Sequence, residues 1–475
     1  MASQDEEDHH QSLHIVVFPW LAFGHLLPFL ELSKRLSQRH SHRISFVSTP
    51  RNLQRIPKPP PHLAHLISFV HLPLPTNPDL PPNAESTLDL DYHQVPYLKA
   101  AFDTLATPFA QFLEISKPDL IIFDFVQHWL PNIASKLNLP CIFFNIFNAS
   151  TTAFAGPPSL AIDVVDPRNE PPHFTVKPNW IPFESNMAYR LHEIRRVFNS
   201  YQLNSDVPSD IFRYTSAVRG CDFMAIRTCN EFEGEFVKVC EEILKEKPVV
   251  LTGLLPPRHV VDMDQQNKLP LSIKQWLDLR EPRSVVYVAF GSEVKLTQGE
   301  IEELAHGLEM SEVPFFWVLK MKYSIQTQLR VPLGFEERVR GRGMVYIEWA
   351  PQQEILSHES IGGFVNQSGW SSVIESLANG LPMAVLPMAS TQGLVARLVV
   401  WRRVGVEIES DERDGSFTRE AVAKAVRVVM VEEEGEVVRE EARKAREVFG
   451  DESLNDGYLD GFELFLRERV RAFKR

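Results

Sequence analysis

The stretch that decides the fold is residues 349–392, WAPQQEILSHESIGGFVNQSGWSSVIESLANGLPMAVLPMASTQ. It holds two short apolar runs, IGGFVNQ at 361–367 and PMAVLPM at 382–388, separated by a helical segment that starts at Ser371 and Ser372. Continuous apolar strands that alternate with helices are typical of a parallel sheet covered on both faces. The stretch therefore predicts part of an α/β fold.

The same alternation extends through most of the chain. Upstream runs at 284–290, 314–320 and 343–349 complete one series, in which Thr297 and Glu300 form a capping-box pattern that opens a helix. In the first half, helical segments such as those at 26–39 and 129–137 lie between further strand candidates. These candidates are residues 14–20, 43–49, 66–72, 119–125, 141–147 and 222–227. Two doubly wound α/β units are predicted, joined by the polar, proline-containing segment 255–271.

Size and charge narrow the classes of function. A chain of 475 residues is too long for one ordinary core. It carries 49 Lys and Arg against 62 Asp and Glu, a net charge of −13, which argues against nucleic acid as the main partner. The four cysteines show no metal-ligand spacing. The start of the chain lacks signal-peptide character, and no apolar run approaches the roughly 20 residues of a membrane span. A reduced, cytoplasmic protein without a metal is expected.

Three side chains within 349–392 suit a nucleoside. Trp349 ends the predicted strand 343–349, where its indole can stack on a flat base. Gln352 offers amide donors and acceptors to uracil or ribose, and Glu375 can accept hydrogen bonds from both ribose hydroxyls. In doubly wound sheets, ligands bind at the carboxyl ends of the strands, where these residues are expected.

The middle and the end of the stretch suit a diphosphate and a sugar. Gly369 permits a close approach of the backbone to an anion, and Ser371 and Ser372 lie in the first turn of the following helix. The free amides and positive dipole end of a helix N-terminus favour anionic groups. Gln392 follows the next strand, close to where a sugar on the diphosphate would reach. The set predicts a site for a nucleoside diphosphate sugar that needs no metal.

A second pair of polar residues lies at the ends of two strands in the first half. His25 follows the first strand, and the strand DLIIFDF carries Asp124 at its C-terminal end. A buried carboxylate needs a partner, and in a parallel sheet it could orient the imidazole as a general base. The nearby helix N-terminus favours a neutral histidine. His128 lies close to Asp124 and either lines a ligand pocket or is structural.

The ordered motifs WAPQ, EILSH, GGF, GW, SS, ES, GLP and the closing Gln resemble the donor-binding box of the plant family 1 UDP-glycosyltransferases. PWLAFGHLLPFLELSKRL, IRTCNEFEGEF and SVVYVAFGSE extend the resemblance along almost the whole chain, most closely to the subgroup that adds a sugar to an already glycosylated metabolite. The resemblance implies a monomer with the GT-B fold of two facing Rossmann-like domains. The expected parts are an acceptor-binding domain at 1–254, a linker at 255–271, a UDP-sugar-binding domain at 272–451, and a helix at 452–475 that packs back on the first domain.

The resemblance also implies roles for individual residues. Trp349 would stack on uracil, Glu375 would hold the ribose, Gln392 would hold sugar hydroxyls and Ser292 would contact the diphosphate. His25 would be the base, supported by Asp124. The family pattern adds neighbours to each set. They are Ala350 and Trp370 for the donor, and Phe23, Gly24 and His128 for the acceptor.

This chain departs from the family pattern at several donor positions. Gln367 stands where the family has a histidine that donates to the diphosphate, and Gln can donate only as a neutral group. Thr391 replaces an acidic residue that accepts from sugar hydroxyls. Ser371 and Val395 each stand where asparagine is common. The expected reaction is inverting transfer of glucose or rhamnose to a hydroxyl of a glycosylated terpenoid or flavonoid.

Two other interpretations stay open. Gln367 and Thr391 fit a catalytically impaired homologue that binds a glycoside or a nucleotide. An enzyme that glucosylates an aglycone also fits, because acceptor choice lies in the irregular segments 79–97 and 157–209. A nicotinamide dehydrogenase is disfavoured, since no G-x-G-x-x-G follows the first strand.

Overall fold

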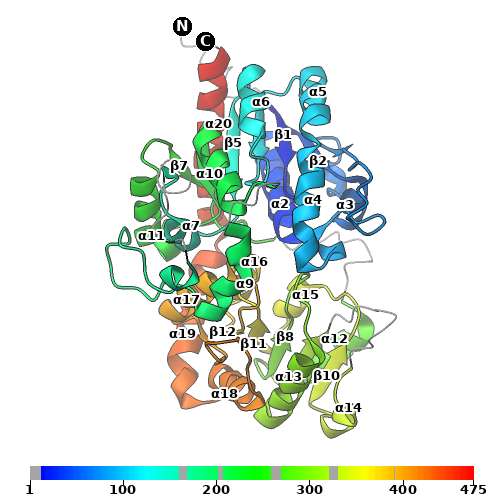
Figure 1. Ribbon diagram of the computed structural model, residues 1–475. Coiled ribbons are helices and arrows are strands. Elements are labelled where there is room, and N and C mark those ends of the chain that lie inside the picture. Colours follow the sequence, from blue (N-terminus) through cyan, green and yellow to red (C-terminus); the bar gives the residue numbers. More distant parts are fainter. Residues whose placement is uncertain are drawn as a thin grey trace. The chain divides into compact units, whose positions relative to one another are not determined.

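The structure is a computed structural model that describes residues 12–159, 168, 170–201, 207–257, 269–319, 330–389 and 391–474 (Figure 1). The chain forms two compact units. The first comprises Met1–Pro167, Asn199–Leu255 and Glu452–Arg475, and the second comprises Arg168–Phe198 and Pro256–Asp451. The predicted linker at 255–271 lies partly outside the described residues. The segment Arg168–Phe198, which the sequence assigns to the first domain, belongs to the second unit.

The first unit is built on a seven-stranded sheet of order β3-β2-β1-β4-β5-β6-β7, in which all paired strands are parallel. Its strands are β1 His14–Phe18, β2 Arg43–Ser48, β3 Ile67–His71, β4 Leu120–Phe123, β5 Cys141–Asn145, β6 Phe223–Ile226 and β7 Val249–Leu251. Every residue of β4 is fully buried, so this central strand is covered on both faces. The doubly wound fold predicted from continuous apolar runs is confirmed.

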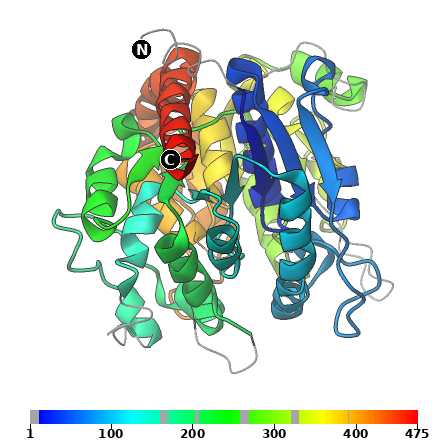
Figure 2. The same cartoon turned by 90° about the horizontal axis from the view of Figure 1, so that it is seen from above.

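Helices connect these strands. They are α2 Phe23–His40, α3 Pro50–Arg55, α4 Val95–Asp103, α5 Ala106–Ser116, α6 Leu130–Lys136, α7 Ala149–Ala155, α10 Asp210–Gly220, α11 Asn230–Ile243 and α20 Glu452–Lys474, with short 3-10 turns at Pro61–Leu63, Thr87–Asp89 and Tyr92–Gln94. The last helix, α20, is drawn in red in Figure 2 and packs on β7 and α2. Its Phe462 and Leu466 are fully buried in the core of the first unit, while Asp456 and Asp460 pair with Arg39 of α2.

The second unit is built on a six-stranded parallel sheet of order β10-β9-β8-β11-β12-β13. Its strands are β8 Val285–Val288, β9 Phe315–Val318, β10 Gly343–Tyr346, β11 Ile361–Asn366, β12 Met383–Val385 and β13 Gly405–Glu407. Its helices are α12 Leu271–Asp278, α13 Gln298–Ser311, α14 Phe335–Arg338, α15 Gln352–Leu356, α16 Trp370–Ala378, α17 Gln392–Trp401, α18 Arg419–Met430 and α19 Glu436–Phe449, with 3-10 turns at Pro171–Phe174 and Glu433–Gly435. The predicted capping box opens α13, where Thr297 Oγ1 accepts from Glu300 N and Glu300 accepts from Thr297 N.

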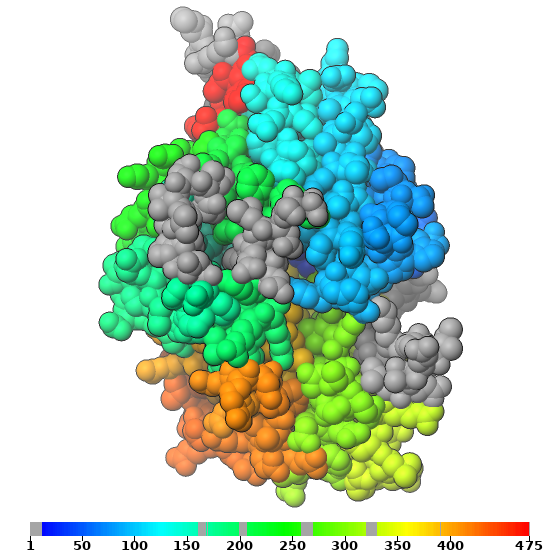
Figure 3. Space-filling model, in the orientation of Figure 1, coloured from blue at the N-terminus to red at the C-terminus, as the bar shows by residue number. Residues whose placement is uncertain are grey.

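The remaining helix, α9 Leu191–Tyr201, begins in the irregular part of the sequence and packs mainly with the second unit. Phe183, just before it, stacks on Trp401 at the end of α17, with ring centroids 6.0 Å apart. In Figure 3 the green surface of this segment adjoins the orange surface of residues near 400. The irregular stretch that the sequence suggests is a functional loop or a short-helix insertion thus contains α9 and belongs to the second unit.

Removing a buried side chain of α20 should destabilise the first unit. We expect Leu466→Ala to lower the free energy of unfolding by about 2–5 kcal/mol, because Leu466 is fully buried and its loss leaves a cavity. Leu464 on the same helix is 46% exposed, so Leu464→Ala is the matched control and should cost less than about 0.5 kcal/mol. Urea unfolding followed by circular dichroism measures both. Equal effects of the two substitutions would contradict the observed packing of α20.

Candidate active site

The first sheet changes the direction of its winding between β1 and β4, which are neighbours in the sheet although far apart in the chain. Connections from such a pair leave toward opposite sides and open a crevice at the carboxyl ends of the strands. His25 is in the first turn of α2, shortly after β1, and Asp124 directly follows β4. The predicted pair therefore lies at the switch point of its sheet.

His25 and Asp124 are in direct contact. His25 Nδ1 lies 2.7 Å from Asp124 Oδ2, and the carboxyl group is only 1% exposed. The same Oδ2 accepts from Trp20 N at 3.0 Å, and Oδ1 accepts from Phe125 N at 2.8 Å. With Asp124 Oδ2 as its acceptor, a neutral imidazole of His25 carries its proton on Nδ1. The unprotonated Nε2 is then left to accept a proton from a ligand.

The surroundings of His25 are largely aromatic. The rings of Phe125 and Phe147 have their centroids 5.7 and 5.8 Å from the imidazole. Phe23 is partly buried and packs on the core of the first unit. Gly24 is exposed, and a Cβ built there meets nothing within 4 Å, so the surface next to His25 is open. This region suits a bulky apolar ligand that brings a hydroxyl group to His25.

His128 is fixed by a buried arginine that sequence reasoning did not single out. Arg213 of α10 is fully buried, pairs with Asp103 and places Nη1 3.1 Å from His128 Nδ1. Because arginine only donates, Nδ1 must accept and the proton of His128 resides on Nε2. Burial lowers the pKa of His128, which keeps the imidazole neutral. His128 thus offers a hydrogen-bond donor, and the ion pair behind it is structural.

The second sheet has the same kind of switch point, between β8 and β11. Gly291 and Ser292 follow β8, and Gln367 follows β11. A Cβ at Gly291 would lie 2.5 Å from Gln367 Nε2, and Gly291 has a φ of 70°, in the left-handed region that favours glycine. Gln367 is buried, and its Oε1 has no partner among the described residues. A buried polar atom left in this way is costly unless a ligand or water completes it.

The helix α16 begins where the sequence predicts. Gly369 is its N-cap residue, followed in the first turn by Trp370, Ser371 and Ser372. Trp370 is buried, with its ring 6.3 Å from that of Phe449. This side chain therefore packs α16 against α19. The N-terminus of α16 thus offers backbone amides next to Gln367 at the switch point, which is the geometry of an anion site.

The residues expected to bind the nucleoside lie near one another. Gln352 Nε2 donates to Glu375 Oε2 at 2.6 Å, which joins the start of α15 to α16. Trp349 is 58% exposed, unusual for an indole in a folded protein and suited to stacking on a base. It lies after β10, which ends at Tyr346, so the prediction that Trp349 itself ends the strand is wrong. Ala350, next to it, is buried and helps to hold this turn in place.

The sugar end of the stretch is held by contacts that the sequence does not reveal. Gln392 Oε1 accepts from the backbone amides of Met388 and Ala389, each at 2.9 Å. Ser368 Oγ donates to Gln392 O at 2.7 Å, and Ser368 has a φ of 61°, in the left-handed region. Thr391 occupies the N-cap position of α17. Strained backbone of this kind at a ligand site is a common mark of function.

Among the described residues, no three His, Cys, Asp or Glu side chains are grouped so that they could hold a metal ion. The four cysteines are buried and free. Over the same described residues, none of the helices combines the length and the apolar character needed to cross a lipid bilayer.

Comparison with known proteins adds a family to this geometry. A family model described as "UDP-glucoronosyl and UDP-glucosyl transferase" matches residues 252–444. UDP-glycosyltransferase 91C1 of Arabidopsis thaliana is 44% identical over 96% of this chain and 97% of its own length. Soyasaponin III rhamnosyltransferase of Glycine max is 39% identical over 95% and 94%, respectively.

Solved structures of the same fold are also similar. That of Arabidopsis thaliana UGT89C1 complexed with UDP-L-rhamnose has a TM-score of 0.73 at 23% identity, over 97% of this chain and 100% of the other. That of Glycyrrhiza uralensis UGT73P12 complexed with glycyrrhetinic acid 3-O-monoglucuronide has a TM-score of 0.77 at 22% identity, over 98% and 96%. The expected GT-B class of two parallel α/β sheets is thereby confirmed.

The contact between His25 and Asp124 predicts which nitrogen of the imidazole carries the proton. At pH 8 we expect Nδ1 of His25 to be protonated and Nε2 to be unprotonated, the reverse of the tautomer that free histidine prefers. The ¹⁵N shifts of labelled imidazoles in two-bond correlation spectra measure this. Asp124→Ala removes the acceptor and should return His25 to the Nε2-protonated tautomer. A proton on Nε2 in the unsubstituted protein would refute the assignment.

Proposed function

The chain belongs to the UDP-glycosyltransferase family, and on this premise we propose that it is an inverting enzyme that transfers a sugar from a UDP-sugar to a hydroxyl group of an already glycosylated plant metabolite. The observation that carries the proposal is the His25–Asp124 pair, in which a buried carboxylate orients the imidazole and leaves Nε2 free. Such a pair is the arrangement of a general base.

In this proposal, the second unit binds the donor. Trp349 stacks on uracil, and the linked side chains of Gln352 and Glu375 hold the nucleoside. The diphosphate lies at the N-terminus of α16, between Gly369 and the connection that carries Ser292. The backbone amides at the N-terminus of α16, with Gly369 as its N-cap residue, support this placement because they are donors suited to an anion.

The reaction follows from the chemistry of these groups. His25 Nε2 takes the proton of the acceptor hydroxyl, and the oxygen attacks the anomeric carbon from the face opposite UDP. The new glycosidic bond forms as the bond to the β-phosphate oxygen breaks, so the anomeric configuration inverts. Asp124 stabilises the imidazolium that forms. The charge on the leaving UDP is stabilised by the first-turn amides of α16, by Ser292 and by the neutral amide of Gln367. The proposed reaction involves no metal or other cofactor. We also propose that the protein is a monomer located in the cytoplasm.

The sugar and the acceptor are proposed on separate grounds. Thr391 supplies no carboxylate for sugar hydroxyls, so a donor with a different hydroxyl pattern, such as rhamnose, is favoured alongside glucose. A similar protein, soyasaponin III rhamnosyltransferase, is named for the transfer of that sugar. The aromatic surroundings of His25 suit a terpenoid or flavonoid skeleton. We therefore propose a glycosylated terpenoid or flavonoid as acceptor.

The base can be tested by substitution. We expect His25→Ala to lower kcat by at least about a hundredfold, since general-base catalysis contributes roughly 10²–10⁴-fold. The affinity for UDP, measured by calorimetry, should change less than twofold, because His25 and the proposed nucleotide-binding residues belong to different units. His14→Ala, a histidine of β1 bonded to Ser45, is the control. Full turnover by His25→Ala would remove His25 from this role.

The donor sugar can be tested at position 391. With UDP-glucose and UDP-rhamnose compared under identical conditions, we expect Thr391→Asp to improve kcat/KM for UDP-glucose by about tenfold, because a hydrogen bond to an ionised acceptor is worth roughly 1.5–3 kcal/mol and one to a neutral group roughly 0.5–1.5 kcal/mol. The change for UDP-rhamnose should be smaller. A strong and exclusive preference of the unsubstituted enzyme for UDP-glucose would contradict the proposed effect of Thr391.

The substitutions at positions 367 and 391 also fit a protein that binds without turnover. Release of UDP from each donor, assayed with a panel of glycosides and aglycones, separates this alternative from the enzyme. UDP release with glycosides supports the proposal, and release with aglycones alone favours direct glucosylation of an aglycone. Binding of UDP without release from any donor favours the impaired homologue.

A further inference from the structure

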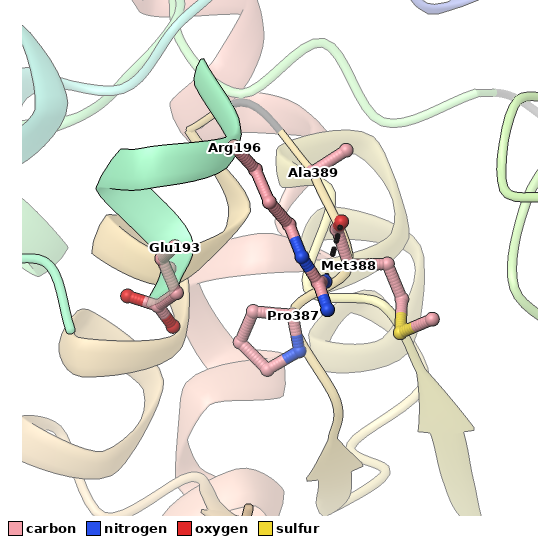
Figure 4. Close-up of a pocket in the computed structure, with 6 residues that line it drawn as sticks. Glu193, Arg196, Pro387, Met388 and Ala389 are labelled. Atoms are coloured by element: carbon pink, nitrogen blue, oxygen red, sulfur yellow. Dashed lines mark hydrogen bonds between the residues drawn. The ribbon is translucent and has the colours of Figure 1, made fainter. Parts of the chain in front are cut away.

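The helix α9 comes from a segment far from residues 349–392 in the sequence. It nevertheless contacts the connection between β12 and α17, just before Gln392. Figure 4 shows α9 above the residues Pro387, Met388 and Ala389, which follow β12. Glu193 and Arg196 extend from α9, and with these residues and Gly393 they line a small hollow. All of these residues belong to the second unit.

Glu193 is anchored in a buried network of charges. It is 7% exposed and accepts from Arg397 Nη2 at 2.9 Å and from Arg190 N at 2.7 Å. Arg397 also pairs with Glu407 at the end of β13, and Arg190 Nη2 lies 3.0 Å from the same carboxylate. Three ion pairs therefore link Glu193, Arg397, Glu407 and Arg190 in a chain, and the hydrogen bond from Arg190 N to Glu193 fixes the start of α9 against α17 and β13. Buried charges persist only when they are paired in this way.

The carboxylate of Glu193 also lies on the first turn of α17. A Cβ at Gly393 would be 2.4 Å from Glu193 Oε2, so the glycine permits an approach that any other residue would block. A negative group near the N-terminus of a helix is stabilised by the helix dipole. The position of Gln392, the residue before Gly393, is thereby tied to α9.

Arg196 also contacts the connection between β12 and α17. Its Nη1 donates to Met388 O at 3.3 Å, the dashed line in Figure 4, and its Nη2 donates to Asp414 O at 3.1 Å. The backbone amide of Met388 donates to Gln392 Oε1. The carbonyl of Met388 therefore accepts a hydrogen bond from Arg196, and the backbone amide of the same residue orients the Gln392 side chain.

We propose that Glu193 and Arg196 of α9 are positioning residues for the donor sugar, which set the place and direction of the Gln392 amide and thereby the discrimination between sugars. The inference rests on the proposed function, in which Gln392 binds the sugar. Because Met388 N and Ala389 N both donate, Gln392 Oε1 faces them and its Nε2 is the group left for a ligand.

The role is one of position, not of contact. The carboxylate of Glu193 is already occupied by Arg397 and a backbone amide, and both assigned hydrogen bonds of Arg196 go to carbonyls of the second unit. A misplacement of about 1 Å at a binding group can reduce rates about a hundredfold. Small shifts of the Met388–Ala389 segment are therefore sufficient to change how a sugar is held, without any change at the nucleotide.

Calorimetric binding of UDP, UDP-glucose and UDP-rhamnose to the full-length protein tests the proposal in the absence of an acceptor. We expect Arg196→Ala to weaken binding of at least one UDP-sugar by about tenfold, as when the displaced Gln392 amide loses a hydrogen bond to the sugar, and to change the ratio of the two UDP-sugar affinities. UDP itself should bind within twofold of the unsubstituted protein. Glu193→Gln, which keeps the shape and removes the charge, should act in the same direction.

Arg413→Ala is the matched control, because Arg413 is 86% exposed and pairs with Asp411 without contacting Met388. It should leave all three affinities unchanged. Equal weakening of UDP and UDP-sugars, or unchanged affinities in both α9 variants, would overturn the proposal.

Transfer of the sugar to an acceptor is measured in a separate assay. Unsubstituted protein that binds UDP-sugars but transfers none contradicts the proposed function, while the binding ratios still decide the role of α9. Unsubstituted protein that binds UDP but no UDP-sugar overturns the inference itself.

Discussion

A parallel sheet brings the carboxyl ends of all its strands to one edge, and this constraint governs both units of the protein. In each, the buried strands fix an edge, and the change of winding between two neighbouring strands opens a crevice there. At the β1/β4 edge the hydrogen bond between His25 and Asp124 forms across 99 residues of sequence. At the β8/β11 edge, Gly291 and Gln367 meet in the same way. The chemistry of each unit follows from the place where its strands end.

This constraint explains why much of the site could be predicted from the sequence. A residue that follows a long apolar run, as Asp124 follows LIIF, has its place in the fold fixed by the buried strand before it. The same holds for Gln367 after IGGFVN, and the turn with Gly369 announces the N-terminus of α16. Local patterns were sufficient at these positions, because strand, turn and helix start are each encoded within a few residues.

Other features have no local signal. The strands β7 and β13 have three residues each, too short to stand out from the neighbouring sequence, and only pairing with the sheet defines them. The charges of α9 resemble those of any solvated helix, yet Glu193 is buried by a partner 204 residues away, Arg397. Arg213 is a similar case, since its role depends on Asp103 and His128, which the sequence places on other elements. Contacts across such separations are set by tertiary packing.

The proposed sugar end of the donor site shows how these long-range contacts shape its chemistry. Gln392 is a potential donor and acceptor, but two backbone amides occupy its oxygen and leave the Nε2 donor. Thr391 brings a hydroxyl in place of a carboxylate, and the carboxylate of Glu193 nearby is committed to Arg397. The site is therefore short of strong acceptors for hydroxyl protons. A sugar with fewer hydroxyl groups leaves fewer donors unpaired in such a site, so a deoxy sugar loses less on binding than glucose does. The sugar preference proposed for this enzyme thus depends both on which residues lie near the sugar and on which of their polar atoms already have hydrogen-bond partners in the protein.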